Sequence, residues 1–238
     1  MRLGAPLCAA ALLLPRPAGA HEAGQPHPSG TPGEGRLTGM AEVGLGWLVL
    51  PGAEVCVEPS IAGCSRGDSS LGLEAWQLFR ATREFAAGAG LLLGLTPTTD
   101  APREDPPGVT RDHTRRYFTV EAAGRYYAIT SPTFEGWAGI GGGLVVVSDR
   151  FESTQGRTDK ALVGPRGVTI RTEGFTVGVA AGVAYLFSPS WSVGGALRYG
   201  SWFLPKEPAK SPFGDEASLR NQVNLVSFGV NLAYRIPL

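Results

Sequence analysis

The stretch Thr176–Phe187, "TVGVAAGVAYLF", places a large apolar residue at nearly every second position and a small residue between them. Successive side chains of a β-strand point to opposite faces, so the stretch predicts a strand with one bulky face and one small face. Val177 and Val179 share the bulky face, opposite Gly178 and Ala180. A soluble barrel would turn its bulky face inward and present a charged exterior, but the small face here carries no charge. The pattern therefore indicates that hydrocarbon surrounds the barrel and that the small face lines a narrow interior.

The same period of two recurs along the chain from Arg36 onward. The segments that show it are 37–50, 72–81, 85–96, 117–129, 134–148, 172–187, 192–204 and 222–236. In the second segment Trp76 and Gln77 break the alternation, so a bulge or a short amphipathic helix is an alternative there. Each of the other segments predicts a strand.

The connections between these segments alternate in length. Long polar connections follow the first, third, fifth and seventh segments, at 51–71, 97–116, 149–171 and 205–221. Tight connections follow the second, fourth and sixth segments, at 82–84, 130–133 and 188–191. This order is typical of an up-and-down meander with every long loop at one end. Residues 36–238 are therefore predicted to form an all-β domain, an eight-stranded antiparallel up-and-down transmembrane β-barrel.

Charged residues are rare on the small faces, and eight of them are predicted to point into the interior. They are four acids and four bases: Glu42, Glu74, Arg80, Glu121, Arg125, Glu135, Arg198 and Arg235. A buried charge without a partner is costly to desolvate, so these groups are expected to pair as a Glu/Arg network across the lumen. Glycines of the small faces would make room for the arginine side chains. A plugged lumen is the leading interpretation, and a narrow pore is the alternative.

The N-terminal part of the chain predicts export. Residues 1–20 combine Arg2, an apolar run and a small-residue cleavage site at 18–20, which is the pattern of a secretory signal peptide. Residues 21–35 are rich in Pro and Gly and predict a flexible lead-in. In an oxidising compartment Cys56 and Cys64 are expected to form a disulfide in the first long connection, with two free thiols as the alternative.

The overall composition excludes several classes of function. Lys plus Arg equals Asp plus Glu, at 21 each, which gives no electrostatic basis for a nucleic-acid partner. The glycine-rich stretch 139–143 lies within a predicted strand rather than between a strand and a helix, so it does not predict a nucleotide site. There is no paired-cysteine metal spacing in the sequence, and we expect neither a cofactor nor a metal.

The last predicted strand carries the most specific motif, "SFGVNLAY" at 227–234. It is similar to the assembly signal of the small eight-stranded outer-membrane proteins of the OmpA-transmembrane, OmpX and OmpW kind. Its defined positions are Ser227, Gly229, Leu232 and Tyr234. That family usually ends on an aromatic residue, whereas this chain ends on Leu238. The resemblance implies the outer membrane of a Gram-negative bacterium, periplasmic termini, and periplasmic chaperones and the barrel-insertion machinery as partners.

One catalytic alternative rests on His113, which lies in the second long connection between Asp112 and Thr114. A hydrolase could use a histidine with an acid and a hydroxyl, but such groups converge from separate elements of a fold. We expect His113 to be a solvated loop residue and the protein not to be an enzyme.

The leading functional hypothesis is a monomeric, porin-like integral outer-membrane barrel with a plugged lumen. Its surface-displayed loops would serve envelope structure or surface interaction. The alternatives are a narrow pore or conduit for small apolar molecules, and a surface hydrolase of lipid or peptide.

Overall fold

The computed structural model describes residues 37–53, 67–95, 111–153, 167–212 and 215–238. The predicted signal peptide, the lead-in, Cys56 and Cys64 lie outside these residues. The described residues form the strands β1 (Thr38–Leu50), β2 (Asp68–Arg80), β3 (Phe85–Gly94), β4 (Arg111–Thr130), β5 (Phe134–Ser153), β6 (Gly167–Leu186), β7 (Trp191–Phe203) and β8 (Gln222–Pro237). None of the described residues forms a helix long and apolar enough to cross a bilayer.

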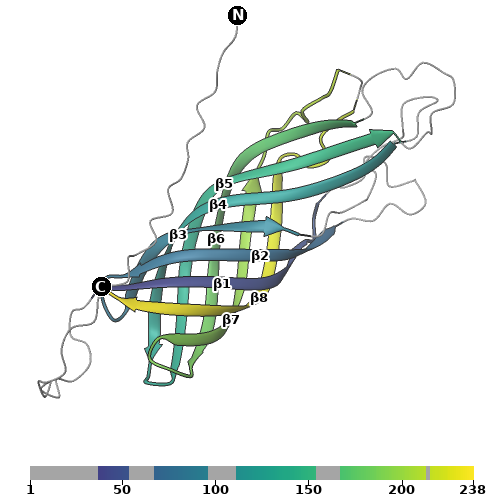
Figure 1. Cartoon of the computed structure of the whole chain (residues 1–238). Coiled ribbons are helices and arrows are strands. Elements are labelled where there is room, and N and C mark those ends of the chain that lie inside the picture. Colours follow the sequence, from purple (N-terminus) through teal and green to yellow (C-terminus); the bar gives the residue numbers. More distant parts are fainter. Residues whose placement is uncertain (1–36, 54–66, 96–110, 154–166, 213–214) are drawn as a thin grey trace, which may run out of the picture. The chain divides into compact units, whose positions relative to one another are not determined.

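The strands form one closed antiparallel barrel, in which each strand pairs with its neighbours in sequence and β8 pairs with β1 (Figure 1). The tight connections 81–84, 131–133 and 187–190 lie at the end of the barrel where β8 ends, which we call the short-turn end. The opposite end, from which the other connections leave, is the long-loop end. The predicted eight-stranded up-and-down barrel is confirmed.

Four strands reach at least four residues farther toward the long-loop end than predicted. One is β2, which begins at Asp68, and the other three, β4, β5 and β6, extend beyond the rest of the barrel (Figure 1). β4 begins six residues earlier, at Arg111, and β5 ends five residues later, at Ser153. β6 begins five residues earlier, at Gly167. These extensions are largely polar on their outward face, and a search for apolar alternation therefore places the strand ends too close to the middle of the barrel.

Strand β2 is regular where the sequence pattern is ambiguous. It pairs with β1 without interruption through Trp76 and Gln77, so neither the bulge nor the helix is present. Gln77 faces outward and Trp76 faces the interior. Trp76 fits there because it lies against Gly90 of β3, where an added Cβ would stand 2.3 Å from the indole. A register shift occurs instead between Tyr127 and Ile129 of β4.

The bulky faces of the strands lie on the outside of the barrel. In β6, Val177 and Val179 are 50% and 54% exposed, whereas Thr176 between its bulky neighbours is 1% exposed. In β5, Ile140 is 71% exposed. The prediction that the small faces line the interior is therefore confirmed.

The apolar exterior has the height of a membrane. It extends along β5 from Phe134 to Val146 and along β6 from Phe175 to the turn residue Phe187, twelve residue steps in each case. At ~3.3 Å per residue on a strand tilted by ~45°, twelve steps rise about 28 Å. The hydrocarbon core of a bilayer is about 30 Å thick. We call this surface the apolar band.

The described residues form three clusters of buried apolar side chains, and the two larger ones fill the interior. The cluster toward the long-loop end comprises Leu48, Leu50, Ala53, Leu92, Tyr117, Val145, Val147, Trp202, Leu204, Leu219, Val223 and Leu225. The cluster toward the short-turn end comprises Met40, Trp76, Leu78, Ala86, Tyr127, Trp137 and Ala233. Glycines accommodate these rings as well as the arginines: a Cβ on Gly182 would stand 2.6 Å from the Trp137 ring. The large inward residues of one strand are thus matched by small residues of its neighbour.

Candidate functional site

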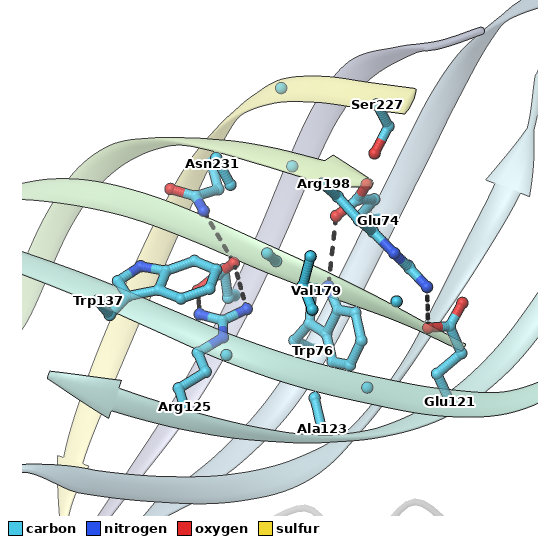
Figure 2. Close-up of a pocket in the computed structure, with 18 of the residues that line it drawn as sticks. Glu74, Trp76, Glu121, Ala123, Arg125, Trp137, Val179, Arg198, Ser227 and Asn231 are labelled. Atoms are coloured by element: carbon cyan, nitrogen blue, oxygen red, sulfur yellow. Dashed lines mark hydrogen bonds and ion pairs between the residues drawn. The ribbon is translucent and has the colours of Figure 1, made fainter. Parts of the chain in front are cut away.

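The first group of interior charges joins β1, β4 and β8 in the middle of the lumen. Arg125 Nη1 lies 2.8 Å from Glu42 Oε2, and Arg125 Nη2 lies 3.2 Å from Glu42 Oε1. Asn231 donates a further hydrogen bond to Glu42 at 2.8 Å. The guanidinium carbon of Arg125 lies 4.0 Å from the centre of the Trp137 ring (Figure 2). The carboxylate and the aromatic face compensate the buried positive charge of Arg125, and the Asn231 amide stabilises the carboxylate.

Two further groups lie on either side of the first. Toward the long-loop end, Arg198 of β7 is paired with Glu121 of β4 (Figure 2). At the short-turn end, Glu135 of β5 accepts hydrogen bonds from Arg80 Nη1 at 2.8 Å and from Arg235 Nη2 at 2.5 Å. One carboxylate therefore binds two arginines, one from β2 and one from β8. These two strands flank β1, which lies four strands away from β5 in the closed barrel.

Glu74 is the remaining predicted charge, and it forms no ion pair with any described residue. Its partner is Trp76, whose Nε1 donates to Glu74 Oε2 at 3.4 Å. Glu74 borders a cavity of about 50 Å³ that Glu121 and Arg198 also line (Figure 2). A space of that size holds a few water molecules. The structure thus brings seven of the eight predicted residues into three separate groups and leaves Glu74 beside the small cavity.

A second buried polar group lies at the long-loop end, beyond the apolar band, and it corrects the expectation for His113. His113 is not a solvated loop residue: it lies in β4 and is 3% exposed. Its Nε2 lies 2.7 Å from Asp149 Oδ1 of β5, and its ring lies against Phe151 at 4.7 Å between centres. The cause is the early start of β4, whose alternation continues and turns His113 inward. We call Asp68, His113, Arg115, Asp149 and Ser218 the upper cluster.

Asp149 is the centre of the upper cluster. It is fully buried and accepts hydrogen bonds from Ser218 Oγ at 2.6 Å and from the Ser218 backbone N–H at 3.1 Å, besides the one from His113. Burial alone would raise the pKa of Asp149, but the hydrogen bond from His113, the charge of Arg115 and the hydrogen bond from Ser218 outweigh it. The pKa of Asp149 therefore lies below its ordinary value.

Arg115 connects the rest of the upper cluster. It is fully buried, and its Nη1 lies 2.7 Å from Asp68 Oδ2 of β2 while its Nε donates to Ser218 Oγ at 2.5 Å. The Ser218 hydroxyl therefore accepts from an arginine and donates to a carboxylate. A nucleophilic serine needs to donate its hydroxyl hydrogen bond to a base such as His113. The Ser218 hydroxyl donates to Asp149 instead.

Ser218 reaches this position because the connection after β7 folds back over the extended strands. Its neighbour Ala217 packs on Phe151 and Ile170, and Leu219 belongs to the interior cluster of the long-loop end. Sequence reasoning missed Asp68, Arg115, Asp149 and Ser218. The continued alternation of β4 and β5 could have indicated the second and third of these, whereas Ser218 lies in a segment with no period.

The residues of the assembly motif alternate across β8. Ser227 is buried on the inward side, and Gly229 follows on the same side opposite Gly46 of β1. Leu232 and Tyr234 are exposed on the outward side. The strand thus places the motif partly in the lumen and partly on the apolar band.

The fold and its exterior define a closed eight-stranded barrel of the kind that spans membranes. No protein-family model matches the chain, and no curated protein matches its sequence. Similar solved structures include the attachment invasion locus protein Ail of Yersinia pestis, in complex with the heparin analogue sucrose octasulfate, at 10% identity. That match covers 84% of this chain and 99% of Ail with a TM-score of 0.49.

Two other similar structures are outer-surface or outer-membrane proteins by name. Neisserial surface protein A is 12% identical, over 83% of this chain and 96% of that chain, with a TM-score of 0.45. The outer membrane protein OprG from Pseudomonas aeruginosa is 12% identical, over 87% and 99%, with a TM-score of 0.44. The likeness is one of fold.

Proposed function

We propose that the protein is a non-enzymatic integral barrel of a Gram-negative outer membrane, with a plugged lumen and surface-displayed loops that serve envelope structure or surface interaction. The apolar band carries this proposal. Side chains such as Ile140, Phe175 and Val230 are more than half exposed around a closed barrel. Such a surface is stable in hydrocarbon, and barrel closure leaves no unpaired strand edge within the apolar band.

The packing of the interior supports the plugged lumen. From the short-turn end, the lumen is occupied in turn by the Glu135 group, by Trp137 with the Glu42–Arg125 pair, and by the Glu121–Arg198 pair. The large cluster around Trp202 and the upper cluster follow at the long-loop end. An eight-stranded barrel is normally filled by its side chains in this way.

The bonding of the upper cluster supports a non-enzymatic role. The Ser218 hydroxyl donates to Asp149 rather than to His113, and both His113 and Asp149 are buried beneath the connection that contains Ser218. A substrate would have to displace that connection to reach either group.

The outward residues Leu232 and Tyr234 and the inward residues Ser227 and Gly229 support a role for β8 as the signal read by periplasmic chaperones and the barrel-insertion machinery. In the proposed orientation the short-turn end and both termini face the periplasm, and the barrel is a monomer. Tyr234→Ser should slow insertion by purified insertion machinery, and an unchanged rate would contradict the assignment.

Membrane extraction and heat-modifiable gel migration test the proposed function. The mature protein should stay in the membrane pellet after urea or carbonate washing and should migrate faster unboiled than boiled, because a folded barrel resists detergent. Recovery as a soluble periplasmic monomer would contradict the proposal.

A narrow pore or conduit is a second candidate, favoured by the cavity beside Glu74. Planar bilayers distinguish it from a plug. A plugged barrel should show no steady conductance, because Arg125 and Arg198 lie across the lumen on either side of the cavity. Steady channels in the wild-type protein would favour the pore.

A further inference from the structure

Two arginines lie on the outward face of the extended strands, beyond the apolar band; on β6, Glu173 lies between Phe175 of the band and Arg171. Arg116 of β4, Ser148 of β5 and Arg171 of β6 are paired side by side, with Ser148 in the middle. Both arginines are exposed. One pair closer to the membrane, Phe118 and Val146 belong to the apolar band. We call Arg116, Ser148 and Arg171 the arginine row.

No described residue forms an ion pair with either guanidinium group of this row. Within the described residues, neither Arg116 nor Arg171 forms an ion pair or a side-chain hydrogen bond, whereas Arg150, one pair farther from the membrane, is bound to Glu152. Glu173, two residues from Arg171 on the same face and paired with Val146, likewise forms no ion pair with a described residue. Two exposed cations without an ion-pair partner among the described residues therefore lie at the boundary between apolar and polar exterior.

We propose that the arginine row binds the phosphate of a phosphorylated lipid headgroup in the outer leaflet. The proposal rests on the proposed function, because it requires the long-loop end to face that leaflet. Neighbouring strands are ~4.8 Å apart, so the Cα atoms of Arg116 and Arg171 are separated by about 10 Å. Two long side chains at that separation can meet on one phosphate, and guanidinium groups bind phosphate oxygens in a bidentate manner.

The position of the row favours a lipid over a soluble anion. A lipid whose phosphate meets Arg116 and Arg171 would place its acyl chains along Phe118 and Val146, and both ends of the molecule would then be bound. A soluble phosphate would gain the charged contacts alone, and these are weakened by solvent and salt at an exposed site. The acyl chains therefore supply most of the selectivity for a membrane ligand.

Lipid retention in a purified sample tests the proposal. The mature protein is reconstituted in phosphatidylcholine nanodiscs, diphosphoryl lipid A is added, and bound lipid is measured by native mass spectrometry. R116Q and R171Q should each weaken retention roughly tenfold, as loss of one charge-assisted bond would, and the double variant should weaken it further. The R116K/R171K variant should retain part of the binding, and E173Q should strengthen it.

Arg83→Gln is the matched control, because Arg83 is an exposed arginine in the turn at the short-turn end. Retention by R83Q should equal that of the wild type. The proposal is overturned if the double variant retains lipid A as the wild type does, if R83Q loses as much, or if millimolar inorganic phosphate displaces the lipid.

Heat-modifiable migration of each variant is recorded first. A wild-type protein that does not insert contradicts the proposed function. An inserted, folded wild type that retains no lipid A contradicts the arginine row alone.

Discussion

The lumen ion pairs and the upper cluster are both buried and polar, but they are held together in different ways. The pair Glu42–Arg125 joins two strands whose positions are fixed by barrel closure. The upper cluster needs Ser218, which comes from a connection that folds over the end of the barrel. The comparison teaches that the lumen ion pairs connect the strands of the barrel, whereas the upper cluster attaches the connection after β7 to the end of the barrel. Loss of a lumen ion pair should lower the stability of the whole barrel, and loss of the upper cluster should affect the long-loop end alone.

The largest effect is expected from breaking the central lumen pair. Arg125→Met leaves the Glu42 carboxylate buried, with Asn231 as its remaining hydrogen-bond partner among the described residues. Loss of one member of a buried ion pair should lower the free energy of unfolding by about 3–5 kcal/mol. Urea unfolding of the protein in lipid vesicles measures it.

The double variant E42Q/R125M is the control for that change. It removes both charges and should recover much of the lost stability, since no unpaired charge remains. A single variant as stable as the wild type would show that the pair does not contribute to the barrel.

A smaller global effect is expected where packing rather than charge fills the lumen. Gly182→Ala forces the Trp137 ring to shift and should cost about 1–3 kcal/mol in the same unfolding measurement. Gly195→Ala on the outward face of β7 meets its nearest atom at an ordinary 3.6 Å and should change stability by less than about 0.5 kcal/mol. Equal effects of the two substitutions would contradict a packed lumen.

Asp149→Asn should affect the long-loop end alone. It removes the charge that Arg115, His113 and Ser218 share, so the connection after β7 should open more often. Trypsin cleavage at Lys206 and Lys210 should become severalfold faster while the unfolding free energy of the barrel stays near that of the wild type.

Glu84→Gln, an exposed residue in a tight turn at the short-turn end, is the control and should leave the cleavage rate at Lys206 and Lys210 unchanged. If Asp149→Asn lowered barrel stability as much as Arg125→Met, the distinction between the lumen ion pairs and the upper cluster would be wrong.

The smallest effect is the acid response of the upper cluster. The pKa of Asp149 is lowered by folding, so its stabilisation is fully present above the ordinary value of 3.8 and is lost as the pH falls through the lower folded value. Hydrogen exchange of the Ser218 amide should therefore stay slow at about pH 5 and accelerate, beyond its intrinsic pH dependence, only in stronger acid. Opening near neutral pH, or the same acid step in Asp149→Asn, would contradict this.

Alternation in the sequence was sufficient to predict the barrel and the direction of its faces. A strand has only two faces, and Val177 and Gly178 cannot both meet lipid. The pairing of charges was less predictable, because which strands face each other across the lumen depends on barrel closure. Glu74 forms no ion pair with a described residue, although it lines the same cavity as Arg198. His113 was misplaced because β4 continues beyond the apolar band, where hydrophobic alternation no longer marks it. Ser218 could not be found, since its contacts are made by a segment without regular structure.

The central claim is that the bulky face of β6 meets lipid and the small face meets the lumen. Methyl-labelled, otherwise deuterated protein in protonated lipid bilayers or nanodiscs tests this directly by nuclear Overhauser effects to the acyl chains. The methyl groups of Val177, Val179 and Val183 should show contacts with acyl-chain methylenes, and those of Ala180 and Ala184 should show none. Acyl contacts at Ala180 and Ala184 with none at the valines would contradict the account.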